Sequence, residues 1–272
     1  MALRKMKLSD GWYPHRKEGI EEYVEAWEKN AAPLRGEAAA GVVPHAGLFY
    51  SGEEAWRIIR EIPVKTETVI IAGGHLPPGI SPMCWTEDEY ETPFGNMKMD
   101  KALFEELCID MPRDTMMDNT IEIQLPLLAC RNRNWNVLAL RLPPESDSYE
   151  WGKNAAHACS RLGIRAFFLG STDLTHYGSS YGNTMYSDRN NPVECVARQD
   201  DELLGMVAAG DVEGTLGSVN SKGTACSIGG ALGAAGFADY ENRLPGAVLS
   251  RTGSYEKTGR SGDFVEYGTV LF

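Results

Sequence analysis

The sequence has no long apolar run. None of its windows approaches the roughly 20 consecutive apolar residues that a membrane helix needs. The first residues, MALRKMKLSDGWYPHRKEG, also lack the apolar centre of a signal peptide. We therefore expect a cytoplasmic protein without a membrane-spanning segment.

Positive charge is scarce as well. The chain carries 26 Lys and Arg residues against 38 Asp and Glu residues, a formal net charge of −12. Nucleic acids and anionic membranes are bound through cationic surfaces, so neither is an expected partner. We expect a small-molecule substrate or another protein instead.

Three sequence motifs are missing. The six cysteines form no CxxC pair, which in a cytoplasmic chain predicts mostly buried thiols rather than a disulfide framework. No GxGxxG fingerprint is present, so a dinucleotide site is not expected, and the glycines of residues 229–236 (GGALGAAG) are better explained by close helix packing. No GxSxG elbow is present either, which disfavours a hydrolase triad.

The sequence does contain ample apolar material, 43% of its residues. Short apolar segments alternate with amphipathic ones, a pattern typical of α/β proteins whose largely parallel sheet is covered by helices on both faces. We expect residues 1–272 to form a single domain of this class. Expected helices are 17–30, 53–61, 120–130, 150–162 and 193–208, expected strands are 68–74, 137–142, 165–172, 247–250 and 264–272, and a long surface loop is expected at 175–192.

The positions of the histidines are informative. Of five, three come at or just after the end of an apolar segment: His45 after GVVP, His75 after VIIAGG and His176 after FFLGSTDLT. The carboxyl ends of parallel strands share one edge of a sheet, where ligands of open α/β proteins bind. The pattern indicates a metal site or an acid–base cluster. The alternative is three loop histidines that are hydrogen-bonded to backbone.

Cys226 is the one cysteine with a chemical context. Thr224 would cap a short helix and place Cys226 in its first turn, where free N–H groups and the helix dipole favour a thiolate. The alternative is a small buried residue within a Gly/Ala packing face. We expect the other five cysteines to be structural.

Carboxylates accompany these residues. Asp173 and His176 in GSTDLTHYG are candidates for an acid–base or orienting pair. Glu122 in NTIEIQLP has two interpretations, a buried structural carboxylate or a hydrogen-bond partner for an imidazole.

Six ordered segments resemble the motifs of the Memo-like family: PHAGLFYSG (44–52), GGH (73–75), YETPFG (90–95), NTIEIQLP (119–126), STDLTHYG (171–178) and TACSIGG (224–230). The resemblance implies a fold like that of class III extradiol dioxygenases, with a central mixed, largely parallel sheet flanked by helices. It implies an iron or copper site whose ligands are His45, His75 and Cys226. It also places Asp173, His176 and Tyr50 at the pocket.

The implied ligand set suits redox chemistry. Two imidazoles and a thiolate leave a coordination position open, and a thiolate is softer than the carboxylate of extradiol enzymes. Iron as Fe²⁺ is the expected cofactor, and copper or zinc also fits these ligands. Asn119 departs from the family pattern, which has a histidine there, and an amide cannot shuttle protons.

We expect a metal-dependent, dioxygenase-like oxidoreductase that acts on a small organic substrate. His176 would be the general acid–base, Asp173 would orient it, Tyr50 would position the substrate, and Glu122 is the fourth catalytic candidate. A non-catalytic metal-binding or adaptor protein is the alternative, and a metal-free hydrolase using Asp173 and His176 is a third. The resemblance implies protein partners of the radical-SAM and AMMECR1 types, and the sequence leaves a homo-oligomer open.

Overall fold

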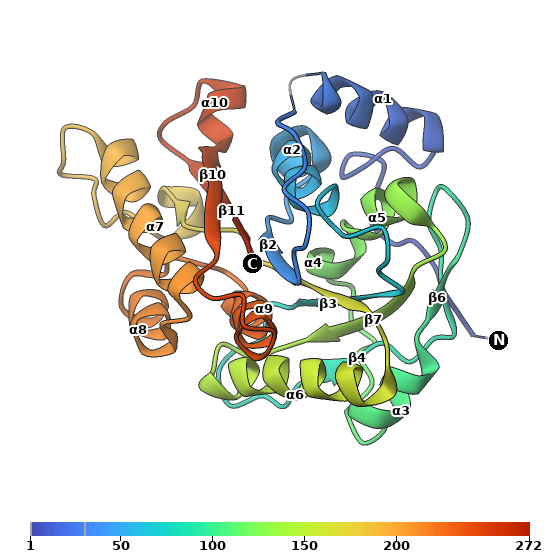
Figure 1. The fold of residues 1–272 in the computed structure, drawn as a ribbon. Coiled ribbons are helices and arrows are strands. Elements are labelled where there is room, and N and C mark those ends of the chain that lie inside the picture. The colour runs from blue at the N-terminus through green and yellow to red at the C-terminus, as the bar shows by residue number, and fades with distance from the viewer. Residues whose placement is uncertain (1, 30) are drawn as a thin grey trace.

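The computed structural model describes residues 2–29 and 31–272 and is built around one mixed sheet of 11 strands (Figure 1). The strands follow the spatial order β1-β5-β6-β7-β3-β8-β2-β11-β10, with β4 beside β7 and β9 beside β11. Their bounds are β1 Leu3–Arg4, β2 Ala40–Val43, β3 Thr68–Gly73, β4 Met83–Cys84, β5 Glu89–Tyr90, β6 Met97–Met99, β7 Asn136–Arg141, β8 Ala166–Ser171, β9 His176–Tyr177, β10 Ala247–Gly253 and β11 Phe264–Leu271.

The middle of the sheet is parallel. Strands β6, β7, β3, β8 and β2 all run in one direction, and β11 and β10 close the sheet in antiparallel orientation. Ile70 of β3 is in register with Leu138 of β7 and Phe168 of β8, and all three side chains are fully buried. Apolar side chains on both faces explain why these segments read as continuous apolar runs. The predicted mixed, largely parallel sheet is confirmed.

Helices cover both faces of the sheet (Figure 1). One face packs on α6 and α9, and the other packs on α1, α2 and α5. The bounds are α1 Lys17–Glu28, α2 Leu48–Ile59, α3 Lys101–Leu107, α4 Asn119–Glu122, α5 Leu125–Asn132, α6 Ser146–Leu162, α7 Pro192–Ala209, α8 Val212–Lys222, α9 Ile228–Tyr240 and α10 Ser254–Thr258, with a 3₁₀ turn, η1, at Ser179–Tyr181. None of the helices in the described parts is long and apolar enough to span a bilayer.

The glycines of α9 let this helix touch backbone on two sides. A Cβ atom on Gly236 would lie 1.9 Å from the carbonyl oxygen of Tyr149 in α6. A Cβ atom on Gly230 would lie 2.3 Å from the carbonyl oxygen of Ala72 in β3. Both distances are too short for any side chain, so this helix packs as closely as the glycine pattern predicts.

Several predicted segments differ from the structure in their bounds. Helix α2 begins at Leu48 rather than 53, and residues 120–130 form parts of two helices, α4 and α5, rather than one. The segment 175–192 contains β9 and η1 and is not all loop, because pairing with β11 orders its start. Residue 30, the predicted end of the first helix, lies outside the described residues.

Candidate metal centre

Three neighbouring parallel strands bring the predicted site residues together. Strands β3, β8 and β2 are adjacent in the sheet. His75 follows β3, Asp173 follows β8, and His45 follows β2 at the same edge. His176 lies in β9, whose pairing with β11 sets it opposite Val265. The sequence argument from strand ends therefore led to a real spatial cluster.

Cys226 reaches the cluster from the connection between α8 and α9. Helix α9 begins at Ile228 with Ser227 as its N-cap, so Cys226 precedes the helix and does not lie in its first turn as predicted. The difference arises because tertiary contacts hold this connection in place. The backbone N–H of Cys226 donates to the carbonyl oxygen of Asp173, and that of Ser227 donates to Oγ1 of Thr172.

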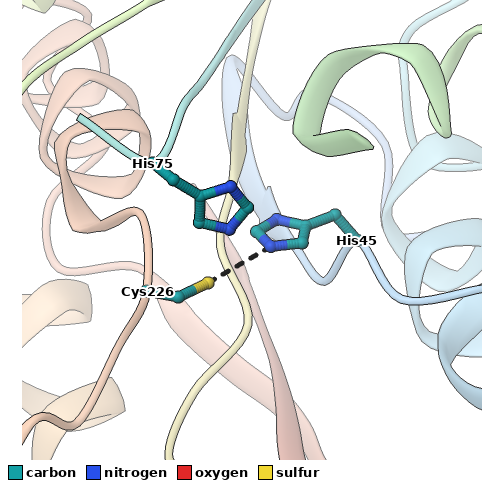
Figure 2. Close-up of side chains that lie close together, drawn as sticks. All are labelled: His45, His75 and Cys226. Atoms are coloured by element: carbon teal, nitrogen blue, oxygen red, sulfur yellow. Dashed lines mark hydrogen bonds between the residues drawn. The ribbon is translucent and has the colours of Figure 1, made fainter. Parts of the chain in front are cut away.

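The three predicted ligands converge (Figure 2). His45 Nε2, Cys226 Sγ and a ring nitrogen of His75 all lie within 4.8 Å of one another. Sγ of Cys226 is 3.2 Å from Nε2 of His45, and the two imidazole rings meet edge to face with centroids 5.1 Å apart. A small shift of these side chains would bring the three atoms around one ion, since Zn–N and Zn–S bonds measure roughly 2.0–2.3 Å.

The hydrogen bonds of Ser171 assign the tautomer of His45. The Ser171 hydroxyl donates its only proton to the carbonyl oxygen of Thr120 at 2.6 Å. Its oxygen therefore accepts from Nδ1–H of His45, 3.3 Å away, and from the Gln124 amide. The proton of His45 thus lies on Nδ1, and the lone pair of Nε2 points toward Cys226.

A carboxylate orients His75 in the same way. Nδ1 of His75 lies 3.2 Å from Oδ2 of Asp118, which also pairs with Arg141 at 3.3 Å. Burial raises the pKa of Asp118, but the hydrogen bonds from His75 and Thr120 outweigh burial and hold this pKa well below its usual range. An ionised Asp118 accepts the Nδ1 proton and leaves Nε2 of His75 free for a ligand, an arrangement frequent around metal-binding histidines.

Burial controls protonation at the centre. It lowers the pKa of His45 to about 3, with repulsion from His75 adding to the effect, so His45 is neutral at physiological pH and ready to donate its lone pair. Burial, followed by the nearby Asp173, raises the pKa of the Cys226 thiol well above its ordinary value. The predicted helix-stabilised thiolate is therefore wrong for the metal-free site, where the thiol donates to His45. A cation would have to displace that proton.

Asp173 lies between the imidazoles of His45 and His176. Its Oδ1 accepts from the backbone N–H of His45 at 2.7 Å, and its Oδ2 lies 3.7 Å from Nε2 of His45 and 3.9 Å from Nε2 of His176. Burial raises the pKa of Asp173 to about 6 and lowers that of His176. Nε2 of His176 is buried and makes no hydrogen bond to any residue in the described part of the chain.

A cavity of about 950 Å³ opens onto this cluster. His45, His75 and His176 line it together with Tyr50 of α2 and Asn119 of α4. The Asn119 amide donates to the carbonyl oxygen of His45 at 3.0 Å, so it fixes backbone beside the site. A second cavity, of about 600 Å³, is lined in part by Cys226, His176 and Tyr181.

Glu122 lies elsewhere. Its Oε1 accepts from the backbone N–H groups of Lys7 and Leu8 and from the Tyr13 hydroxyl, at 2.7–2.9 Å. It is not among the residues that line the large cavity. The structure thus supports the structural interpretation of Glu122, because its carboxylate is committed to the N-terminal segment and none of its hydrogen bonds reaches an imidazole of the described residues.

Sequence reasoning assigned no role to three residues that hold the imidazoles: Asp118, Ser171 and Thr120. Thr120 donates to Asp118 and accepts from the backbone N–H of Gly74, which links α4 to the end of β3. The available signal was the N-cap pattern Asp118-Asn119-Thr120, which predicts the start of a helix but not its position beside His75.

Comparison with known proteins identifies the family of this chain. A family model described as "Memo-like protein" matches residues 4–269. A "MEMO1 family protein" of Pyrococcus furiosus is 28% identical over 253 residues, covering 85% of each chain. Another, from Methanosarcina acetivorans, is 24% identical over 281 aligned positions, covering 100% of this chain and 99% of the relative.

A solved structure shares the fold. The crystal structure of an uncharacterized protein from Escherichia coli K12 superposes with a TM-score of 0.54, covering 87% of this chain and all of that one. Because the two sequences are only 12% identical, this likeness is evidence for the fold and not for a shared function. From the match of the family model over nearly the whole length, the chain belongs to the Memo-like protein family.

Proposed function

We propose that this protein is a metal-dependent, dioxygenase-like oxidoreductase that acts on a small organic substrate, with His45, His75 and Cys226 as metal ligands. One observation carries the proposal: the three donor atoms lie within 4.8 Å of one another, and two of the residues that supply them, His45 and His75, line a cavity of about 950 Å³. A cavity of this size would enclose a small organic molecule. Fe²⁺ is the metal we expect, and copper or zinc would also fit two nitrogen donors and one sulfur donor.

The chemistry of the residues fits a cation. Both imidazoles carry their protons on Nδ1, toward Ser171 and Asp118, and so present Nε2 lone pairs. Cys226 completes a set of three protein donors, which leaves at least one position open. When bound, a redox-active metal would supply one-electron chemistry and that open position.

The protein's own residues would handle protons and orientation. Nε2 of His176 is buried with no hydrogen-bond partner in the described residues, so it can accept a proton from a substrate hydroxyl. Asp173 lies 3.9 Å from that nitrogen and would orient the ring and stabilise its charged form. Tyr50 lines the cavity and would position the substrate. Asn119 has no titratable proton, so we assign it no acid–base step.

Oxygen uptake tests the proposal. Iron-reconstituted protein would be assayed against a panel of small organic substrates, with chelated protein and His176→Gln as comparisons. Uptake that depends on substrate, disappears on chelation and falls about 100-fold or more in His176→Gln would support it. Substrate turnover that survives chelation and consumes no oxygen would instead support a metal-free hydrolase using Asp173 and His176. Stoichiometric metal without turnover of any substrate would support the adaptor alternative.

A further inference from the structure

The lining of the large cavity includes one cationic side chain, and this residue is not one of the predicted metal ligands. Arg260, in the connection between α10 and β11, is the only Arg or Lys among the described residues that line it. The side chain of Arg260 makes no ion pair or hydrogen bond with any described residue, and only its backbone N–H is used, donating to Oγ1 of Thr258. Arg260 is exposed, so its guanidinium is hydrated and can exchange that water for an anionic ligand that enters the cavity.

The nearest acidic residue in the chain forms no ion pair with Arg260. Asp263 also lines the cavity, but its Oδ1 accepts from the backbone N–H of Ser180 at 2.9 Å. Asp173, the other acidic residue in the lining, is buried and committed to the backbone N–H of His45. The guanidinium of Arg260 therefore keeps its donors available for an anionic group.

Aromatic side chains form much of the remaining wall. Trp12, Tyr50, Tyr181 and Tyr267 line the cavity, and Tyr50 and Tyr181 are 40% and 48% exposed. Tyr181 meets the ring of His176 edge to face, with centroids 5.1 Å apart. Partly exposed aromatic faces beside a catalytic candidate favour a flat, apolar ligand body, because rings gain stacking and edge contacts there.

We propose that the cavity binds a small aromatic carboxylate, with the ring between these aromatic side chains and the carboxylate at Arg260. A single planar guanidinium matches the charge and the geometry of one carboxylate. A dianionic phosphate carries two negative charges, and a single guanidinium would leave one of them without a positive partner. This inference deepens the proposed function by naming its substrate class, and it depends on that function only for the reaction at the metal end of the cavity.

Ligand titration of the metal-free protein tests it without any turnover. Benzoate, benzamide and phenyl phosphate would be titrated into wild type, Arg260→Gln and Arg260→Lys, with the exposed Arg198→Gln as the matched control. We expect wild type to prefer benzoate over both other probes, since benzamide has the same shape without charge. Arg260→Gln should weaken benzoate binding by about tenfold and leave benzamide binding unchanged, because it removes a hydrogen bond to a charged group. Arg260→Lys should be intermediate, and Arg198→Gln should match wild type.

The other outcomes overturn either this inference or the proposed function. It fails if benzoate does not bind, if benzamide binds equally well, or if Arg260→Gln leaves benzoate affinity unchanged. Tighter binding of phenyl phosphate would replace the carboxylate with a phosphate. Benzoate that binds only to metal-loaded protein, equally in wild type and Arg260→Gln, would mean that it ligates the metal, which refutes the subsite but not the proposed function. Arg260-dependent binding in a protein that takes up no metal would refute the proposed function and keep the subsite.

Discussion

Oδ2 of Asp118 accepts a hydrogen bond from Nδ1 of His75 at 3.2 Å while Arg141 pairs with the same oxygen at 3.3 Å. This relationship turns Nε2 of His75 toward His45 and Cys226. The arrangement depends on α4, since Asp118 is the N-cap of that helix and accepts from the backbone N–H of Thr120. A helix start thus orients a candidate metal ligand that follows a strand.

Asp118→Asn should weaken metal binding by about 10–100-fold, because a neutral amide orients and polarises His75 less strongly than a carboxylate. Competitive titration with a chromophoric chelator measures this change. Asp188→Asn, at an exposed position, is the control and should bind metal like wild type. An unchanged affinity in Asp118→Asn would show that His75 needs no such orientation.

Glu122→Ala should destabilise the fold by at least about 2 kcal/mol, since it leaves two backbone N–H groups and the Tyr13 hydroxyl without their charged acceptor. Tyr13→Phe removes one of these bonds and should cost about 1 kcal/mol. Urea unfolding gives both values. Metal content of the folded Glu122→Ala protein should stay at the wild-type level, and a stable variant that loses metal would restore Glu122 to the site.

Gly236→Ala should destabilise the protein by about 1–3 kcal/mol, because its Cβ would meet the carbonyl oxygen of Tyr149 at 1.9 Å and force α9 away from α6. Gly205→Ala is the matched control in α7, where no atom lies within 4 Å of the added carbon. It should stabilise by about 0.4–1 kcal/mol. Thermal unfolding of both variants measures these changes in stability. Equal changes in the two variants would argue against close packing of α9.

Stability should depend on pH through Asp200. Burial raises the pKa of this carboxyl from 3.8 to about 7, although it accepts hydrogen bonds from the backbone N–H and hydroxyl of Thr175. The folded state then binds more protons than the unfolded state between these two values, so the contribution of Asp200 to stability is greatest at low pH and decreases as the pH rises to about 7.

Asp200→Asn should remove that part of the pH dependence. The free energy of unfolding of the variant, measured by urea at several pH values in this window, should fall less steeply with rising pH than that of wild type. Asp110→Asn, at an exposed position, should retain the wild-type slope. Identical slopes in wild type and Asp200→Asn would mean that Asp200 ionises like an exposed carboxylate.

Much of the parallel sheet could be predicted from sequence because its strands are buried on both faces. The segments containing β3, β7 and β8 read as apolar runs. The histidines singled out after β2, β3 and β8, which are His45, His75 and His176, line one cavity in the structure. Helix α2 was predicted to start too late because its first turn depends on a tertiary contact. The backbone N–H of Leu48 donates to the carbonyl oxygen of Trp12, which no local pattern reveals.

The rest of the site could not be predicted for a related reason. Asp118 and Ser171 matter because α4 and β8 place them beside imidazoles from other strands, over separations of 43 and 126 residues. The state of Cys226 was predicted from a helix dipole, but in the structure burial and Asp173 dominate. Local sequence rules describe neither burial nor distant charges.

Metal analysis tests the central claim most directly. Wild type, His45→Ala, Cys226→Ser and the control Cys195→Ser would be purified anaerobically, and their bound metals quantified by plasma mass spectrometry. We predict near-stoichiometric iron or copper in wild type and Cys195→Ser, and its loss in His45→Ala and Cys226→Ser. A wild-type protein that holds no metal and takes none up on reconstitution would contradict the account.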